Sequence, residues 1–481
     1  MSCWQPITKL MAHQQAAVAK LLPSKVGALF MEMGTGKTRT AIEFAHLRQN
    51  KIDRVVWFCP VSVKHTIERE LYKHTNCNKQ QILVFDDKTR ISTHKLRSAF
   101  WLIVGIESMS SSQRVVSAIH AVMDNRTMVV LDEATYIKGP RSLRSRRIEL
   151  VSRDTRYRMI LTGTPMTQGV QDLYMPMAFL SKKILGYNSF YTFANAHLEY
   201  EQVRVDGKKI TTDRIISSHD TDLLARKMAP YCYQVKKEEC LDLPPKIFTS
   251  FSGYMTGDQQ EQYALAKERF AERVMDMDIL EMRKPLLKLF TELQTIVCGF
   301  VTVDGKTTTM PHRRLDLLDE ILGQVDGPVV IWGKYHHCID EITDMLAQRD
   351  GASSVHQYHG LLSEKARARS LQQWADQGRY LVATQAAGGH GLNELLCASN
   401  VVFYANGFKY SERLQAEDRT HRLGQTKNCW YADIYLQESI DTRINNALLA
   451  KENALQDFMR EMHQLRNDGI KESVLKMVQA L

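Results

Sequence analysis

Two separate series of short apolar runs alternate with helix-length polar segments along this chain. The first series comprises Val26–Met31, Val55–Cys59, Trp101–Gly105, Met128–Leu131 and Met159–Thr162. The second comprises Val329–Trp332, Ser354–His359, Tyr380–Thr384, Val401–Tyr404 and Trp430–Ile434. Strand-length apolar runs that alternate with helical segments predict a parallel sheet covered by helices on both faces. Because the pattern occurs twice in 481 residues, the sequence predicts two α/β lobes in tandem.

The segments outside these series predict a connector, a helical insert and a helical tail. Leu241–Lys246 (LDLPPK) contains adjacent prolines, which break a helix and mark a connector. Apolar residues recur at helical spacing in Thr256–Val297, Asp441–Leu481 is predicted to be helical, and Val205–Asp213 is typical of a polar hairpin or loop insertion. The predicted domains are lobe 1 at 1–240, connector and helical insert at 241–305, lobe 2 at 306–445, and the helical tail at 446–481.

Composition excludes several classes of protein. Hydrophobic residues at 44% and charged residues at 24% are typical of globular domains, and they exclude wholesale disorder or a collagen-like chain. The nine cysteines contain no CxxC pair, which argues against a zinc ribbon and favours reduced thiols. No apolar run approaches the length of a membrane span. We therefore expect a cytoplasmic protein without a membrane partner (in the host cytoplasm if the source is a phage), and the net charge of +9 favours a polyanionic partner.

A candidate phosphate-binding loop lies at Phe30–Thr38 (FMEMGTGKT), between an apolar run and a helical segment. Its glycines allow backbone N–H groups to face a phosphate, while Lys37 would reach the β- and γ-phosphates and the Thr38 hydroxyl would bind Mg²⁺. The first glycine of the GxxxxGK[ST] pattern is replaced by Met31. Taken alone, the segment also fits a helix-capping turn.

Met128–Thr135 (MVVLDEAT) supplies the carboxylates that such a loop needs. It is an apolar strand that ends in Asp132, which could hold Mg²⁺ through water, and Glu133, which could orient and polarise the attacking water. The alternative is a surface Asp-Glu pair at a helix N-terminus.

Gln415–Gln425 (QAEDRTHRLGQ) places Arg419 and Arg422 three residues apart, which predicts one helical face. Two guanidinium groups facing a phosphate site would act as arginine fingers. The alternative is a solvated helix with internal Asp–Arg and Glu–Arg pairs.

Together these motifs resemble the Swi/Snf-type DNA-dependent ATPases of helicase superfamily two, in a compact form similar to those of phages and bacteria. The resemblance runs from about residue 9 to 445 in the family's order. Besides the motifs above, it is carried by Leu10–Gln14 (LMAHQ), Phe58–Glu70, Tyr136–Ser142 (YIKGPRS), Leu161–Pro165 (LTGTP) with Asp172–Leu173, LDLPPK, Tyr358–Gly360 (YHG), Ala387–Asn393 (AGGHGLN) and Ser439–Ile444 (SIDTRI).

The resemblance implies two RecA-like lobes, ATP and Mg²⁺ as cofactors, and a role for each matching residue. The implied catalytic residues are Lys37, Asp132, Glu133, Arg419 and Arg422. ATP binding is implied for Gln14 (reading the adenine), Met33, Gly34, Thr35, Gly36, Lys37, Thr38 and Gly391; the Mg²⁺ ligands are Thr38 and Asp132. Thr162, Thr164 and Gln415 would couple hydrolysis to DNA, which would lie near Ser62, Lys64, His359, Thr384 and Asn393.

The chain departs from the family pattern at several positions. Thr135 stands where the family usually has histidine, so the contact from this segment to Thr162–Thr164 is expected to be weaker or remade. Gly139, Ala386 and Glu394 also differ from the usual residues. No nucleophile-positioning or phosphate-binding group is lost.

Two further features carry no assigned role. Seven arginines between Arg141 and Arg158 are interpreted as a solvated helix face, with a DNA-facing surface as the alternative. His336-His337-Cys338 is interpreted as structural.

The expected function is ATP-driven translocation on duplex or branched DNA, as a monomer, in replication, recombination or repair. A strand-separating DNA or RNA helicase is one alternative. A nucleic-acid-binding scaffold with a non-hydrolysing ATP site is another, and the motor subunit of a restriction system is a third. Duplex is preferred to single strands because no pattern of aromatic stacking residues is evident. The sequence identifies no protein partner.

Overall fold

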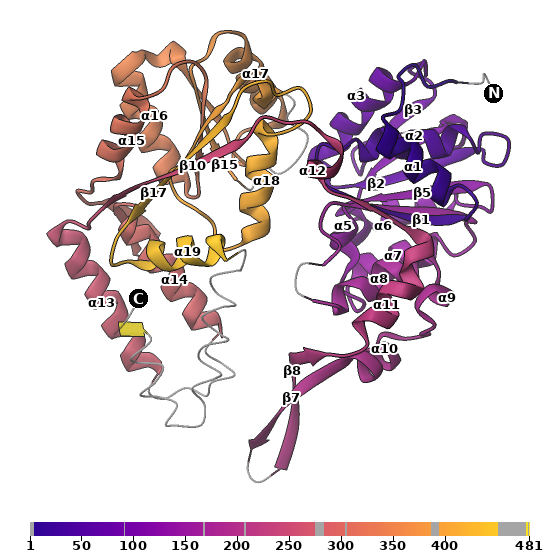
Figure 1. Ribbon diagram of the computed structural model, residues 1–481, viewed down its shortest axis with the longest axis horizontal. Coiled ribbons are helices and arrows are strands. Elements are labelled where there is room, and N and C mark those ends of the chain that lie inside the picture. The colour runs from indigo at the N-terminus through magenta and orange to yellow at the C-terminus, as the bar shows by residue number, and fades with distance from the viewer. Residues whose placement is uncertain are drawn as a thin grey trace. The chain divides into compact units, whose positions relative to one another are not determined.

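The computed structural model describes residues 4–90, 92–166, 169–205, 208–274, 283–303, 305–385, 394–450, 478–479 and 481. The chain forms two compact units, Met1–Asp242 and Leu243–Leu481, whose boundary lies within the LDLPPK connector (Figure 1). Among the described residues, no helix combines the length and the apolar character needed to cross a bilayer.

A parallel sheet with strand order β3-β4-β2-β5-β6-β1-β9 forms the centre of unit 1, and all its described neighbours pair in parallel. Its strands are β1 (Val26–Met31), β2 (Arg54–Cys59), β3 (Ile82–Phe85), β4 (Trp101–Gly105), β5 (Thr127–Asp132), β6 (Tyr157–Thr162) and β9 (Cys232–Val235). The helices of this unit are α1 (Ala12–Leu21), α2 (Lys37–His46), α3 (Lys64–His74), α4 (Thr93–Ser98), α5 (Ser108–Ser111), α6 (Gln113–His120), α7 (Leu143–Val151), α8 (Gln171–Leu180), α9 (Lys182–Leu185), α10 (Phe190–His197), α11 (Thr221–Met228) and α12 (Lys237–Cys240).

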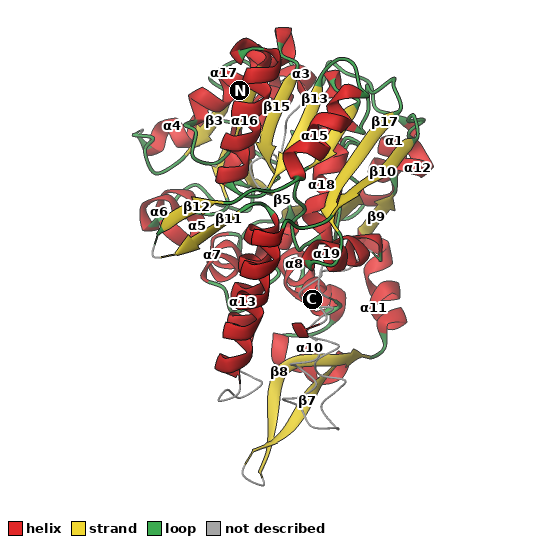
Figure 2. Cartoon of the chain, turned by 90° about the vertical axis from the view of Figure 1, so that its left-hand side faces the viewer, coloured by secondary structure: helices red, strands yellow, loops and turns green. Residues whose placement is uncertain are grey.

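An antiparallel hairpin of β7 (Leu198–Val205) and β8 (Lys208–Ser218) extends from unit 1 beyond α10 (Figures 1 and 2). The described residues of Val205–Asp213, the segment predicted to be a polar hairpin or loop insertion, belong to this hairpin.

Unit 2 contains a second parallel sheet, with strand order β10-β17-β16-β13-β15-β14. Its strands are β10 (Lys246–Gly253), β13 (Val329–Gly333), β14 (Val355–Tyr358), β15 (Tyr380–Thr384), β16 (Asn400–Phe403) and β17 (Cys429–Leu436), and β11 (Phe300–Val303) pairs with β12 (Lys306–Thr309) in a separate hairpin. The helices are α13 (Gly257–Val274), α14 (Arg283–Val297), α15 (Arg314–Gly323), α16 (His336–Asp350), α17 (Glu364–Gln377), α18 (Tyr410–Thr420) and α19 (Ile440–Leu449). The fold class predicted from the sequence, two parallel-sheet α/β lobes, is confirmed.

Both sheets are buried on their two faces, which explains why the strands are continuous apolar runs. Successive residues of β2 belong to different cores: Val56 and Phe58 pack on one face, while Val55 and Trp57 pack on the other. The strands of unit 2 divide in the same way. This is the burial expected for parallel strands, whose crossover helices cover both faces.

Within the two parallel sheets, the three described strands that the sequence analysis did not predict all lie at sheet edges. They are β3 and β9 in unit 1 and β10 in unit 2. Alternate residues of β10 are exposed, so it lacks the continuous apolar run that marks a central strand.

The predicted helical insert forms α13 and α14, which share an apolar core with α19 and the described C-terminal residues Val478 and Leu481. The Tyr263 hydroxyl of α13 donates to the Leu481 carbonyl over 2.8 Å. The predicted C-terminal helix begins as α19, and residues 451–477 and 480 of the tail lie outside the described residues.

A buried ion pair joins α15 to α19 in unit 2. Arg314 is fully buried, and its guanidinium donates to the Asp441 carboxylate and to the carbonyls of Tyr404 and Ile434. One side chain thus ties two helices to the ends of two neighbouring strands.

We expect Asp441→Asn to destabilise unit 2 by about 3–5 kcal/mol, because it leaves the Arg314 cation buried without its carboxylate. Urea denaturation, read for each unit by hydrogen exchange, measures the effect. Asp319→Asn is the control, since Asp319 pairs with Arg349 at the surface and its side chain is 60% exposed; its cost should stay below about 1 kcal/mol. Equal costs for the two variants would contradict the structural role of Arg314–Asp441.

Candidate ATP-binding and hydrolysis site

The phosphate-binding loop connects the end of β1 to the start of α2. Gly34 and Gly36 adopt left-handed backbone conformations, with φ of 81° and 85°. A Cβ at Gly36 would lie 2.1 Å from Nε2 of Gln14, so both backbone conformation and space require glycine there. Met31, at the position of the pattern's first glycine, is the buried last residue of β1 and pairs with Val235, where extended backbone suits any residue.

Lys37 is the first residue of α2, and its ammonium turns back over the loop. Its Nζ donates to the carbonyls of Met31 (2.8 Å) and Glu32 (3.2 Å). Thr38 follows it and is partly exposed. The loop N–H groups, the lysine and the helix N-terminus therefore lie in the arrangement that binds the phosphates of a nucleotide.

Side chains of helix α1 form hydrogen bonds to carbonyl groups of the phosphate-binding loop. Gln14 is buried; its Nε2 donates to the carbonyls of Thr35 (3.3 Å) and Gly36 (3.4 Å). His13, which the sequence analysis did not single out, donates from Nε2 to the Thr35 carbonyl over 2.8 Å. The sequence could have shown this only through the proximity of His13 to Gln14.

Asp132 is the last residue of β5. Loss of solvation, together with the neighbouring Glu133 charge, raises its pKa to about 6, and Lys37 opposes this rise. Above that pH the carboxylate is ionised and available as an oxygen ligand.

Glu133 has a left-handed backbone, with φ of 58°, which is unfavourable for a residue with a Cβ. Its Oε1 accepts hydrogen bonds from the hydroxyls of Thr162 (2.9 Å) and Thr135 (3.0 Å). The Thr162 hydroxyl in turn accepts from the backbone N–H of Thr164 over 3.1 Å. These bonds fix the carboxylate of Glu133 toward the end of β6.

The expected contact between the DEAT segment and Thr162–Thr164 is thus remade in this chain. Thr135 does not reach Thr162 through a bond of its own; both hydroxyls converge on the Glu133 carboxylate. A second link between the same segments is the ion pair of Lys138 with the buried Asp172, at 3.6 Å.

Sheet order explains why these groups meet. Strand β6 lies between β5 and β1, so the residues after β6 lie between the phosphate loop and the two carboxylates. A Cβ on Gly163 would lie 3.5 Å from the Met31 carbonyl and from the Met33 N–H nitrogen, which places this turn against the loop. Lys37, Asp132, Glu133, Thr162 and Thr164 thus share the carboxyl edge of one sheet.

In unit 2, the predicted arginine pair does not lie on one helical face. Helix α18 ends at Thr420, so Arg419 is helical and 3% exposed, whereas Arg422 lies in the following turn. The helix stops there because His421 leaves the helical conformation, its Nε2 donating to the Pro244 carbonyl over 2.7 Å, and Gly424 has a φ of 103°. A spacing of three residues predicts a shared face only within a helix, and α18 ends between the two arginines.

Helix α18 is not a solvated helix, because Arg413 and residues 416–420 are buried. Arg413 donates from Nε to Glu417 (2.8 Å) and from Nη2 to Asp433 (2.9 Å) and stacks on Phe403. Glu417 also accepts from Lys246 over 2.9 Å. Gln415 lies on the same helix and is partly exposed. Arg413 and His421 were missed by sequence reasoning: Glu417 lies one helical turn from Arg413, but the contacts with Asp433 and Pro244 join separate segments.

The predicted DNA-contacting residues fall in both units. Ser62 is exposed just before α3, whereas Lys64 is buried and its ammonium lies 3.1 Å from the Asp86 carboxylate. His359 and Thr384 follow or end the adjacent strands β14 and β15, so they share the carboxyl edge of the second sheet. The predicted residues Gly391 and Asn393 lie outside the described residues.

The donor set in unit 1 fits Mg²⁺ bound together with a nucleotide. No group of three or more metal-binding side chains occurs among the described residues, so nothing in them resembles a cage built from protein ligands alone. The Asp132 carboxylate and the Thr38 hydroxyl are the hard oxygen donors that Mg²⁺ takes alongside phosphates and water.

Fold and site together define a P-loop ATPase with two parallel-sheet units. The SNF2-related domain family matches residues 11–299, and the helicase conserved C-terminal domain matches residues 313–424. Because the first match covers more than half of the chain, this chain belongs to the SNF2-related family. The predicted class, an ATPase of helicase superfamily two and of Swi/Snf type, is confirmed.

Curated relatives are distant and much longer. The chain is 24% identical over 340 residues to the ISWI chromatin-remodeling complex ATPase CHR17 of Arabidopsis thaliana, covering 66% of this chain and 29% of that protein. It is 22% identical over 449 residues to the human DNA annealing helicase and endonuclease ZRANB3, covering 88% and 39%. A solved structure of the Sulfolobus solfataricus SWI2/SNF2 ATPase core in complex with dsDNA aligns with 20% identity and a TM-score of 0.44, covering 100% of this chain and 98% of that one.

We expect Gly36→Ala to destabilise unit 1 by about 1–3 kcal/mol and to abolish nucleotide binding, because the added Cβ meets Gln14 and the left-handed backbone is strained. Thermal unfolding and titration with a fluorescent ATP analogue measure the two effects. The control is Gly323→Ala, because no atom lies within 4 Å of a Cβ placed there. Unchanged nucleotide affinity in Gly36→Ala would refute the assigned loop geometry.

Proposed function

We propose that this protein hydrolyses ATP and uses the energy to move along duplex or branched DNA. The proposal is carried by one observation, the convergence of the phosphate loop, the two carboxylates and Thr162 on one sheet edge of unit 1. The matched relatives' names support the nucleic-acid side of the proposal, because they describe a chromatin-remodeling ATPase and a DNA annealing helicase.

In the proposed reaction, Lys37 and the loop N–H groups bind the β- and γ-phosphates, and Gln14 would read the adenine. Thr38, and Asp132 through water, would hold Mg²⁺, which would neutralise charge on the phosphates. Glu133 orients the attacking water, and its position is set by the hydroxyls of Thr135 and Thr162.

Arg419 and Arg422 are proposed to stabilise the negative charge that develops on the γ-phosphoryl group. They would reach it when the two units close on ATP, and hydrolysis would release them. Glu133 is hydrogen-bonded to Thr162, which is hydrogen-bonded to Thr164. A shift of Glu133 when the nucleotide is hydrolysed would therefore move these threonines and, through them, the DNA-contacting elements. Gln415 would take part in the same coupling.

DNA would be held mainly through its phosphates, with Ser62, Lys64, His359, Thr384 and Asn393 near its path. The basic excess of the chain suits such a partner. A role in replication, recombination or repair rests on the human relative, whose name describes DNA annealing. We expect the protein to act as a monomer.

ATP hydrolysis should be stimulated by DNA, lost in Lys37→Ala and nearly lost, reduced about a thousandfold, in Arg422→Ala, because each removes charge stabilisation from the phosphates. Hydrolysis rates would be measured without nucleic acid and with single strands, duplex, a branched junction and RNA. The exposed Lys51→Ala and Arg273→Ala serve as controls.

Stimulation by duplex or junction supports the translocase. Stimulation by single strands or RNA alone would favour a strand-separating helicase instead. Nucleic-acid binding with no hydrolysis under any condition would leave a scaffold.

Thr135→Val should lower kcat for ATP hydrolysis about tenfold with KM for ATP unchanged, because it removes one of two hydrogen bonds that orient the Glu133 carboxylate. Thr135→Ser keeps the hydroxyl and should restore most of the rate. Steady-state kinetics of the two variants give the answer, and equal rates for valine and serine would rule out the role of the hydroxyl.

A further inference from the structure

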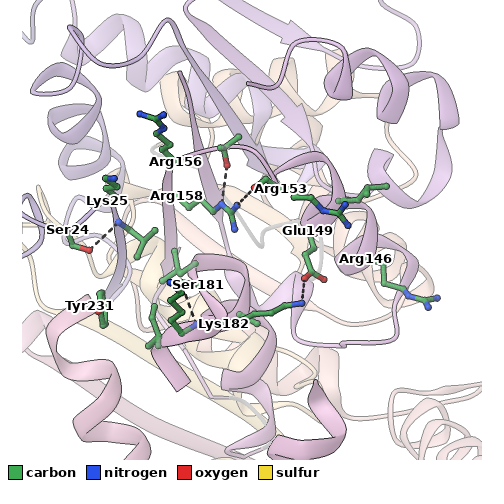
Figure 3. Close-up of a pocket in the computed structure, with 17 residues that line it drawn as sticks. Ser24, Lys25, Arg146, Glu149, Arg153, Arg156, Arg158, Ser181, Lys182 and Tyr231 are labelled. Carbon is green, nitrogen blue, oxygen red and sulfur yellow. Dashed lines mark hydrogen bonds and ion pairs between the residues drawn. The ribbon is translucent and has the colours of Figure 1, made fainter. Parts of the chain in front are cut away.

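A hollow of about 950 Å³ lies on unit 1, outside every motif that carries the proposed reaction. We refer to it as the basic groove. Its walls are the segment before β1, helix α7 with the turn after it, the start of β6, and the junction of α8 and α9. Figure 3 shows the labelled side chains reaching it from these separate elements.

The groove lies at the amino edge of the sheet whose carboxyl edge holds the phosphate loop. Ser24, Lys25 and Val26 line it, and Val26 is the first residue of β1, whereas the loop follows Met31. Five residue steps along a strand separate these ends by about 17 Å. The basic groove is therefore a site distinct from the ATP site.

Charge is concentrated in this groove. Its described lining contains seven cationic side chains and one carboxylate, while the whole chain has a net charge of +9. The carboxylate, Glu149, is paired with Lys182 at 2.9 Å (Figure 3). Within the described residues, Arg146, Arg153 and Arg156 are exposed and form no ion pair. The cations of the described lining therefore outnumber its single carboxylate by six, and three of them are exposed without an ion pair there.

Arg158 provides a fixed cation at the centre of the groove. Its guanidinium donates to the carbonyls of Ser152 (2.7 Å) and Phe179 (2.8 Å) and to the Thr155 hydroxyl (3.1 Å). All these acceptors are uncharged. Burial lowers the pKa of Arg158, and the nearby charges of Glu149 and Asp154 offset this effect only in part. An anion in the groove would relieve this cost.

We propose that the basic groove binds the phosphate backbone of a duplex nucleic acid, at a segment separate from the one that the ATP-driven units contact. The proposal of this ligand rests on the proposed function. The cations come from several elements around a hollow much larger than one phosphate, which suits a polyanion. Four of the seven are arginines, whose planar guanidinium groups bind phosphate in a bidentate manner.

An acidic protein segment is the less favoured occupant. Protein interfaces depend on exposed apolar anchors, and the groove offers Leu150, which is 49% exposed, while Ala178, Leu180 and Ile184 are buried in its floor. Phosphate contacts need no such anchor. The interpretation of the arginine run as a solvated helix face therefore holds only in part, since four of its seven arginines line the groove.

The test compares the full-length wild type with Arg153→Glu/Arg156→Glu, which leaves the structural contacts of Arg158 in place. Lys51→Glu/Lys79→Glu is the matched control, with the same change of charge at exposed lysines outside the groove. Affinity for duplex DNA is measured without ATP across a salt series, and a poly-glutamate peptide is the second probe. Basal ATP hydrolysis without DNA reports on folding and should be equal in all three proteins.

The groove variant should bind duplex about tenfold more weakly at low salt, the effect of losing two exposed ion pairs. The slope of log affinity against log salt should fall by about 1.8, since each lost phosphate contact contributes about 0.9. Identical affinities and slopes for groove and control variants would overturn the proposal. So would groove-dependent binding of poly-glutamate with duplex binding unaffected.

Failure of the proposed function would look different. Duplex binding that depends on the groove, in a wild type whose ATP hydrolysis no DNA stimulates, would support the groove and refute the translocase.

Discussion

Burial of both sheet faces is the constraint on which the rest of this molecule depends. The central parallel strands are mostly apolar because helices cover both sides, so polar chemistry in the middle of the sheet is concentrated where these strands end. The carboxyl ends of β1, β5 and β6 are neighbours in the sheet, and the three segments that follow them carry the lysine, the two carboxylates and the threonines of the candidate site. The site is therefore a consequence of strand order, and residues 95 apart in sequence, such as Lys37 and Asp132, interact electrostatically.

The hydrogen bonds of Glu133 show how a polar side chain at this sheet edge is held in one orientation. Its left-handed backbone is a cost that the surrounding structure must offset, and the two threonine hydroxyls that donate to its carboxylate supply part of that compensation. Thr135 performs this task with a short side chain two residues after the glutamate. The consequence is a tighter dependence of Glu133 orientation on Thr162, because the two threonines share one acceptor oxygen.

Much of this could be predicted from the sequence, for physical reasons. Central strands such as β1, β4 and β15 have the predicted bounds, since a strand buried on both faces leaves an unbroken apolar run. Edge strands such as β10 escaped prediction because one side meets solvent and the pattern weakens. The end of α18 at Thr420 escaped because it depends on a bond from His421 to Pro244, a contact across 177 residues. The bonds from His13 to Thr35 and from Arg413 to Asp433 were missed for the same reason, whereas the loop glycines were found because their constraint is local.

The two edges of the sheet in unit 1 differ in what their charges contact. At the carboxyl edge the cation of Lys37 is matched by Asp132 and by loop carbonyls, which suits a site that must bind and release a nucleotide. At the amino edge the hydrogen bonds of Arg158 go to uncharged acceptors among the described residues, burial outweighs the attraction of Glu149 and Asp154 in its pKa, and the exposed arginines around it form no ion pairs there. A fold does not need uncompensated charge for its stability, since such charges repel one another. The concentration of positive charge in the basic groove is better explained by a ligand that brings negative charge. A phosphate backbone does so at every nucleotide.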